Sequence, residues 1–297
     1  MFNKNNLKKI LYFIGKSLGI IGLVFVFYKL SQEYSLETFS NKMVLLSHTI
    51  PSLVVLNVLS LLIGIFVWYR LLGNYSQKTF PFLAAYYYFT KTDIAKYLPG
   101  NIFHYVGRQV LAAKLHLTQV EMGKISLLNI ILLLTGTIFA STLFAYIADD
   151  TPLLILTLLG LSSIITIIIL LYIYPSFPRK EKIMMNLYIA VSIALQGVML
   201  SIVIAYQSEA FSTNLFMQCA GIYTLSWLIG FVTPGASGGL GVREGVFIAA
   251  MSYLHIDIAE EIVLFSVLFI RLINIMVDVL LYLSTYTLEK KMKELKL

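Results

Sequence analysis

Long apolar runs dominate the chain, and polar residues gather in short stretches between them. A transmembrane helix needs about 20 mostly apolar residues to cross a hydrocarbon core of roughly 30 Å. Six segments meet this requirement and are predicted to span a membrane: about 10–30, 51–72, 125–148, 153–174, 184–206 and 262–286. The first follows several lysines, as a signal peptide would, but its apolar run is too long for one and no small-residue cleavage site follows. We therefore expect it to be retained as a helix.

Two further segments combine an apolar helical pattern with a break. Residues 80–114 begin as an aromatic helix, break at Pro99-Gly100-Asn101 and continue as a short helix. Residues 212–254 repeat this plan, with a break at Thr233-Pro234-Gly235 and a glycine-rich stretch at Gly238-Gly239-Leu240-Gly241. The polar and charged residues of the two segments are Lys91, Asp93, Lys96, His104, Arg108, Arg243 and Glu244. Because Pro and Gly interrupt helices, each segment is predicted to be a broken helical hairpin.

The two broken segments also align with one another. Pro to Arg is nine residues in both, from Pro99 to Arg108 and from Pro234 to Arg243. Downstream, Leu115-His116-Leu117-Thr118 resembles Leu254-His255-Ile256-Asp257, and a Glu follows each His by five residues. A single Pro-Gly pair is a common turn signal, but the joint match favours an internal duplication. We expect one transmembrane domain over residues 1–297, with repeat halves at about 51–148 and 184–286.

Composition supports a membrane protein and excludes a soluble globular one. Hydrophobic residues make up 59% of the chain and charged residues 12%, against about 25% charged in soluble domains. The mean hydropathy is +0.84. The single cysteine, Cys219, rules out an internal disulfide. The expected fold class is therefore an all-α polytopic membrane protein, with about six spanning helices and two broken hairpins.

The positions of Lys and Arg predict the orientation, because cytoplasmic loops carry an excess of them. Basic residues gather at the N-terminus, around residues 70–78, at Lys124, around residues 179–182 and after residue 290, whereas acidic residues predominate in the other loops. Both termini are predicted to be cytoplasmic, so the first hairpin enters from the cytoplasm and the second from outside. Such inverted repeats with broken helices are typical of transporters. Residues 101–114 are too short to cross, which favours a re-entrant first hairpin, while residues 212–254 could be re-entrant or fully spanning.

Arg108 and Arg243 are the leading candidates for function. Arginine inside a bilayer costs several kcal/mol and usually faces a pathway or an internal partner. A guanidinium group binds phosphate in a bidentate way, and N–H groups freed at a helix break add partial positive charge. We expect Pro99, Gly100, Asn101, His104, Pro234, Gly235, Gly238, Gly239 and Gly241 to line the substrate site with them. Alternatively, each Arg extends to an interface or bonds carbonyls of its own hairpin.

A second set of residues is expected to couple or gate transport. Arg271, Asn274 and Asp278 lie at helical spacings of three and four, which makes one polar stripe. Glu244 could carry a coupling proton or pair with Arg271, and the stripe could equally be an internal ion pair. Asp93 and Lys96, one turn apart, could gate or form a local salt bridge. The four histidines show no metal-ligand spacing, so no metal or other cofactor is expected.

The sequence contains no complete motif of a nucleotide-binding enzyme or a serine hydrolase. Residues 239–244 lack the third glycine and the βαβ setting of a dinucleotide-binding loop, and there is no phosphate-binding Gly-Lys-Ser/Thr or Gly-x-Ser-x-Gly motif. The basic residues lie at membrane edges, so nucleic acid is not an expected partner.

Two motifs carry a family resemblance. Lys96-Tyr-Leu-Pro-Gly-Asn-Ile-Phe-His-Tyr-Val-Gly-Arg108 and Thr233-Pro-Gly-Ala-Ser-Gly-Gly-Leu-Gly-Val-Arg-Glu244 resemble the paired signatures of the lysylphosphatidylglycerol synthase transmembrane, or flippase-like, family. The resemblance covers most of the chain, from the second apolar helix to the last. It implies a bacterial or archaeal cytoplasmic membrane protein that moves a lipid or polyprenyl-linked molecule between leaflets. The aminoacyl-transferase domain of the full synthases has no counterpart in this sequence, so lysyl transfer is not expected.

Physics and resemblance together predict a flippase for a phosphate-bearing lipid or polyprenyl-linked molecule. A secondary transporter of a small water-soluble anion and a membrane-embedded lipid-modifying enzyme are the alternatives. Membrane lipids are the expected partners, and further candidates are a second copy of the chain and a lipid-modifying or glycosyl-transferring enzyme.

Overall fold

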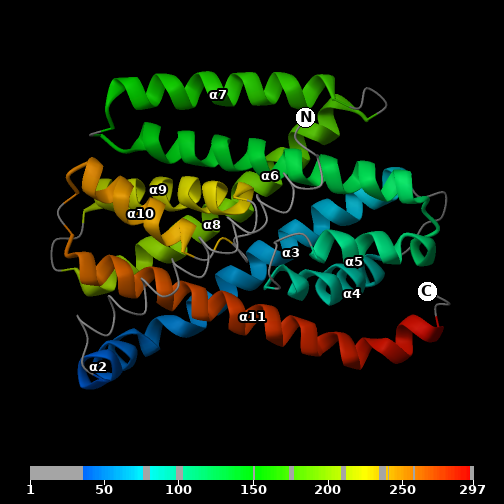
Figure 1. The fold of residues 1–297 in the computed structure, drawn as a ribbon, viewed down its shortest axis with the longest axis horizontal. Coiled ribbons are helices and arrows are strands. Elements are labelled where there is room, and N and C mark those ends of the chain that lie inside the picture. The colour runs from blue at the N-terminus through cyan, green and yellow to red at the C-terminus, as the bar shows by residue number, and fades with distance from the viewer. Residues whose placement is uncertain are drawn as a thin grey trace, which may run out of the picture.

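The protein is described by a computed structural model covering residues 36–75, 81–97, 103–149, 151–173, 177–208, 212–233, 239, 241–256 and 258–294. Every regular element within these ranges is a helix (Figure 1). The α-helices are α2 (Leu36–Leu46), α3 (Ile50–Tyr75), α4 (Phe82–Asp93), α5 (Phe103–Leu111), α6 (Gln119–Ile147), α7 (Leu153–Tyr172), α8 (Arg179–Gln207), α9 (Thr213–Val232), α10 (Val242–Tyr253) and α11 (Glu260–Glu294). Short 3-10 turns are η1 (Ser47–Thr49), η2 (Ile94–Tyr97) and η3 (Ala113–Leu115). The helix predicted at residues 10–30 lies outside the described residues.

Among the described residues, six helices are long and apolar enough to cross a membrane. Five of them, α3, α6, α7, α8 and α11, coincide with predicted spans. The sixth is α9, which the sequence predicted only as one arm of a broken hairpin; its 20 residues give about 30 Å of helix, enough to cross. The protein is therefore a multi-pass, membrane-embedded helical bundle.

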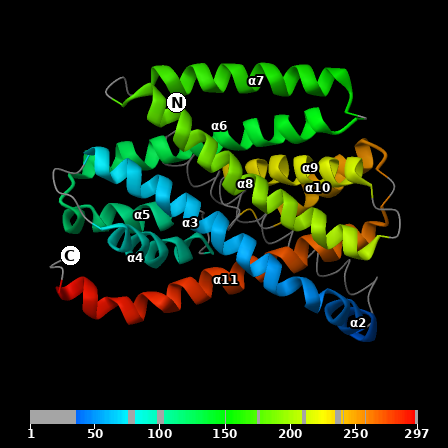
Figure 2. The same ribbon diagram turned by 180° about the vertical axis from the view of Figure 1, so that it is seen from behind.

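Two helix pairs fold back on themselves and lie toward opposite ends of the bundle (Figures 1 and 2). The first hairpin consists of α4, η2 and α5, and the second consists of α9 and α10; the two α-helices of each pack against one another. With 12 and 9 residues, α4 and α5 are each about 14–18 Å long, too short to cross a bilayer. Helix α11 runs the length of the bundle and contacts both hairpins.

The contacts between helices repeat in the two halves. In the first half α3 contacts α4, and in the second α8 contacts α9; similarly, α4 packs on α11 while α9 packs on α6. Helices α3 and α8 meet at Ser60 and Ser192, where each hydroxyl donates a hydrogen bond of 2.9 Å to the other residue's backbone carbonyl. This reciprocal contact is what a two-fold relation between α3 and α8 would produce.

The turns that follow α5 and α10 have the same backbone geometry. Each contains a histidine with positive φ, 54° at His116 and 51° at His255, and these are the only non-glycine residues of the described chain in that conformation. Each His donates its N–H to the carbonyl three residues earlier, and the next residue, Leu117 or Ile256, donates to the carbonyl five residues earlier. This is the paired bonding of a Schellman motif, which ends a helix in a left-handed residue. The aligned sequence positions therefore occupy equivalent turns.

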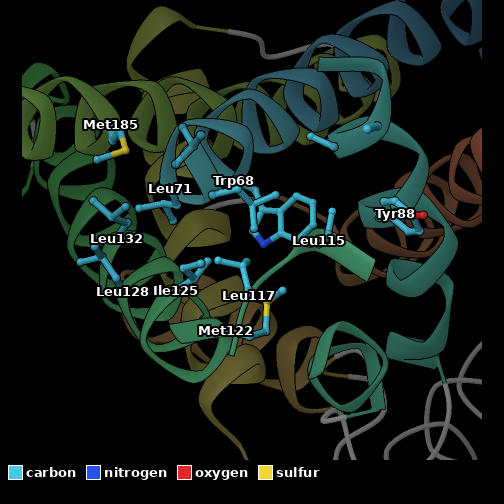
Figure 3. Close-up of a cluster of buried hydrophobic side chains, with 14 of the residues drawn as sticks. Trp68, Leu71, Tyr88, Leu115, Leu117, Met122, Ile125, Leu128, Leu132 and Met185 are labelled. Atoms are coloured by element: carbon cyan, nitrogen blue, oxygen red, sulfur yellow. The ribbon is translucent and has the colours of Figure 1, made fainter. Parts of the chain in front are cut away.

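Two hydrophobic clusters hold the bundle together, one around each hairpin. Figure 3 shows the first, in which Trp68 of α3, Tyr88 of α4 and Leu132 of α6 pack with Leu115 and Met185. Closely packed glycines join the spanning helices: a Cβ on Gly197 of α8, for example, would come within 2.7 Å of the Ala220 carbonyl oxygen on α9. Small residues at such contacts let membrane helices approach closely. Helix α7 lies at the outer edge and exposes most of its leucine and isoleucine side chains, as a lipid-facing helix does.

Candidate functional site

A cavity of about 200 Å³ lies between the two hairpins and is walled by both hairpins and by α3, α6, α8 and α11. Its charged lining residues are Asp93, Lys96, Arg108, Arg243, Arg271 and Asp278. Its neutral polar lining residues are Asn57, Ser60, Asn129, Ser192, Gln196 and Asn274. Its aromatic lining residues are Phe89, Tyr97, His104, Tyr105, Trp227 and Phe231, and Leu61, Gly64, Leu133, Ile189 and Ile193 complete the wall. Such a concentration of charge inside a bundle of apolar helices marks a functional site.

The first hairpin contributes a charge network centred on Asp93. One carboxylate oxygen accepts from Arg108 Nη2 at 3.2 Å, and the other accepts from Lys96 Nζ at 2.8 Å. The salt bridge between Asp93 and Lys96, one of the two sequence interpretations, is therefore present. Lys96 Nζ also lies 2.8 Å from Asp278 Oδ2, and the Tyr97 hydroxyl donates to the same oxygen at 2.5 Å. Because Asp278 belongs to α11, these bonds tie the first hairpin to that helix.

Arg108 is enclosed by aromatic rings. Its guanidinium carbon lies 4.2 Å from the ring centroid of Phe89, 5.4 Å from that of Tyr105 and 5.6 Å from that of Trp68. These are cation–π distances, and the side chain is only 2% exposed. Arg108 Nε has no hydrogen-bond partner within the described part of the chain, and neither does Nδ1 of the nearby, buried His104. The aromatic enclosure and Asp93 together hold Arg108 in place.

The second hairpin contributes a different arrangement. Glu244 of α10 accepts a hydrogen bond from Arg271 Nη1 of α11 at 2.7 Å, and both side chains are buried. This is the structural pairing that the sequence allowed for Glu244. Arg243 is only partly buried, with its guanidinium carbon 5.8 Å from the Trp227 ring centroid. Arg243 and Arg271 both line the cavity.

Glycines shape the backbone beside Arg243. Gly239 has a φ of 75°, and a Cβ there would lie 3.1–3.2 Å from backbone atoms of Gly230 on α9. Gly241, with a φ of 77°, precedes α10. Neither is among the lining residues of the cavity. Both were expected at the substrate site. Both have a positive φ, which glycine adopts without strain, and Gly239 also lies so close to the Gly230 backbone that a side chain would be opposed.

The structure brings most of the other predicted residues to one place. Eight of them line the cavity: Asp93, Lys96, His104, Arg108, Arg243, Arg271, Asn274 and Asp278. Glu244 lies directly behind, bonded to Arg271. Six lie outside the described residues: Pro99, Gly100, Asn101, Pro234, Gly235 and Gly238.

Sequence reasoning named Asn274 but missed the other neutral polar residues of the wall. Asn57 donates a hydrogen bond to Asn274, and Gln196 Nε2 donates to Ser60 Oγ at 3.2 Å. Trp227 and Phe231 stack with an angle of 5° between their rings. Asn57 and Gln196, which are polar residues within otherwise apolar spans, were the available signal.

The described ranges contain no group of three or more His, Cys, Asp or Glu side chains placed to hold a metal ion. Comparisons with protein-family models, with curated proteins and with solved structures gave no match for this chain. The function is therefore argued from the cavity.

Proposed function

We propose that the protein moves a phosphate-bearing lipid or polyprenyl-linked molecule between the two leaflets of a membrane. The observation that carries the proposal is the cavity with six charged side chains inside an apolar helical bundle, between the ends of two oppositely placed hairpins. A charged head group crosses hydrocarbon only at a cost of many kcal/mol, so a translocator has to supply a polar path. The cavity supplies polar and cationic groups inside the apolar bundle.

An inverted repeat is part of the proposal. The reciprocal contact of Ser60 with Ser192, the repeated helix contacts and the matching turns at His116 and His255 support a pseudo-two-fold axis in the membrane plane. The axis exchanges a hairpin entering from one face with a hairpin entering from the other, as in many transporters. We place both termini in the cytoplasm on the charge of the loops, and cysteine labelling from outside sealed cells should miss both ends.

The choice of a lipid over a water-soluble anion rests on the flippase-like resemblance of the paired Pro-Gly and Arg motifs.

The test is a leaflet-exchange assay in liposomes that contain phosphatidylglycerol with a fluorescent label on its acyl chain. Wild-type protein should expose inner-leaflet label to an impermeant quencher, and Arg243→Ala should abolish this exchange. Arg70→Ala is the matched control, because Arg70 is an exposed arginine that pairs with Glu181 outside the cavity; it should exchange at the wild-type rate. A polyprenyl-phosphate sugar provides a second substrate arm.

Three outcomes would contradict the proposal. A folded Arg243→Ala variant that exchanges a verified substrate at the wild-type rate would remove the cavity from the mechanism. Uptake of free phosphate without lipid exchange would indicate a transporter of a soluble anion. A change in lipid mass during incubation would indicate a lipid-modifying enzyme.

A further inference from the structure

We infer that the head group of the substrate carries a hydroxyl-rich unit, a sugar or a polyol, and that this unit binds to a band of amide and hydroxyl side chains in the cavity wall. The inference rests on the proposed function in taking the ligand to be a phosphate-bearing lipid. It deepens that function by naming the chemistry of the head group beyond its phosphate. The band, called the amide band below, consists of Asn57, Ser60, Asn129, Ser192, Gln196 and Asn274.

The amide band belongs to the part of the wall formed by α3, α6, α8 and α11. Helices α3 and α8 reach the cavity through matching positions: Asn57, Ser60, Leu61 and Gly64 on α3, and Ile189, Ser192, Ile193 and Gln196 on α8. Each of the four α8 residues follows its α3 counterpart by the 132 positions that separate the bonded pair Ser60 and Ser192. The cavity is therefore built around the contact of α3 with α8, and its charged lining residues come from the hairpins and α11 instead.

Amides and hydroxyls suit a ligand hydroxyl better than they suit a phosphate. An amide side chain both donates and accepts, as a hydroxyl does. A phosphate presents acceptor oxygens, and its strongest partners are charged donors. A sugar or polyol can use both the N–H and the C=O of each amide, so the neutral wall and the charged wall fit different parts of one head group.

The bonds within the amide band leave such groups for a ligand. Asn57 donates to Asn274, and Gln196 Nε2 donates to Ser60 Oγ at 3.2 Å. Among the described residues, these are the only side-chain hydrogen bonds of Asn57, Asn274 and Gln196. Each amide therefore keeps donors or an acceptor beside the cavity, where the hydroxyls of a ligand can bond them.

A second glutamine of α8 separates ligand binding from helix association. Interhelical hydrogen bonds of polar side chains also hold membrane helices together without any ligand. Gln207 makes a bond of the same kind as Gln196, since its Nε2 donates to Ser266 Oγ of α11 at 2.8 Å. Only Gln196 lines the cavity. Gln207 is therefore the matched control for a role in packing alone.

The volume and the aromatic wall fit one ring-sized unit. The cavity measures about 200 Å³, and a cavity of about 150 Å³ is enough to bind benzene. Tyr97, Tyr105 and Trp227 contribute rings to the wall. The face of an aromatic ring is negative and attracts polarised C–H groups such as those of a sugar.

The test compares three dihexanoyl lipids that carry the same phosphodiester charge: phosphatidylethanol, phosphatidylglycerol and phosphatidylinositol. Their head groups bear no hydroxyl, a glycerol unit and an inositol ring, respectively. Citronellyl phosphoglucose, a short isoprenoid with a phosphodiester of its own, represents polyprenyl-linked sugars. The full chain is kept in lauryldimethylamine oxide, a detergent with neither phosphate nor sugar, and dissociation constants are measured by isothermal titration calorimetry.

We expect phosphatidylinositol or citronellyl phosphoglucose to bind about tenfold more tightly than phosphatidylethanol, with phosphatidylglycerol between them. The tighter of the two identifies the polyol or the sugar as the source of the hydroxyls. Gln196→Met should weaken binding of the tighter ligand about five- to tenfold and that of phosphatidylethanol less than about twofold. Gln207→Met should change neither. If Gln196→Met does not fold, Asn129→Leu on α6 gives the same comparison.

Three results would overturn the inference. Phosphatidylethanol could bind as tightly as the hydroxyl-bearing ligands, Gln196→Met could weaken all ligands equally, or Gln207→Met could cause the same selective loss. Failure of the proposed function looks different. Liposome exchange of phosphatidylethanol as fast as that of phosphatidylinositol would overturn only the hydroxyl-rich head group, whereas exchange of no phosphate-bearing lipid would overturn the function itself.

Discussion

The α4–α5 hairpin holds its arginine in a neutral, enclosed network, whereas the α9–α10 hairpin holds its arginine partly exposed at the cavity wall. Both arginines lie nine residues past a Pro-Gly pair. Both hairpins also end in the same left-handed histidine turn. The aligned motifs and the matching turns are therefore accompanied by different charge arrangements in the two hairpins.

The difference follows from which acids accompany each arginine. Asp93 comes from α4 and reaches Arg108 within the hairpin, and Asp278 of α11 balances Lys96. In the second hairpin, Glu244, the direct neighbour of Arg243, bonds to Arg271 of α11. Helix α11 thus presents an acid to the first hairpin and a base to the second, seven residues apart. The two aligned hairpins therefore differ in how far their arginines are enclosed.

The largest expected effect comes from breaking the ion pair of the second hairpin. Arg271→Met removes the ion pair from the buried Glu244 carboxylate and should lower the free energy of unfolding by about 3–5 kcal/mol. The measurement is thermal or denaturant unfolding in detergent. The double variant Glu244→Gln/Arg271→Met should recover most of the lost stability. A double variant no more stable than Arg271→Met would show that the unpaired Glu244 charge is not the cause of the loss.

The second prediction compares the two equivalent arginines directly. Arg108→Met removes the Asp93 bond and three ring contacts, and we expect a loss of about 2–3 kcal/mol in the free energy of unfolding. Arg243→Met, at a partly exposed position, should cost less than about 1 kcal/mol. The same unfolding assay checks both. Equal losses in the two variants would remove the contrast between an enclosed and a partly exposed arginine.

The third prediction concerns the glycines that only the second hairpin has. Gly239→Ala should destabilise the protein by about 1–3 kcal/mol, because its φ is 75° and the new Cβ would press on the Gly230 backbone. Gly245→Ala is the matched control on α10. A Cβ there meets nothing within 4 Å, so the variant should be neutral or up to about 1 kcal/mol more stable. Equal losses in both variants would argue against the close approach of α9 and α10.

The helices and the charged wall of the cavity were predictable from the sequence for one reason: both depend on the contrast between apolar segments and charged residues. A charge such as Arg108 or Asp278 is conspicuous in an apolar segment because it is costly there. Helix α9 was predicted only as one arm of a hairpin because a Pro-Gly break follows it, although its own 20 residues suffice to cross the membrane.

The pairings of Asp93 with Lys96 and of Glu244 with Arg271 were among the sequence interpretations, but the other charge pairings and most of the neutral wall could not be predicted in the same way. Asp93 reaches Arg108 across a bend of the chain, and Asp278 reaches Lys96 from a distant helix, so no local spacing encodes either contact. Ser60 and Ser192 look like ordinary small residues in spanning helices until α3 and α8 are placed side by side. Such contacts depend on the packing of the bundle.

The smallest expected effect tests what the hairpins share. His116→Gly and His255→Gly should each stabilise the protein by about 0.5–1 kcal/mol, because glycine adopts a positive φ without the Cβ strain that histidine bears. Both side chains are exposed, so little packing is lost. His48→Gly is the matched control: His48 is also exposed, lies in η1 and lacks a positive φ, so glycine there should destabilise slightly. Matching increases in melting temperature at 116 and 255 are expected from equivalent turns. A gain at one position and a loss at the other would mean that the two turns differ energetically despite their shared backbone, and the argument for a duplicated scaffold would lose its most local support.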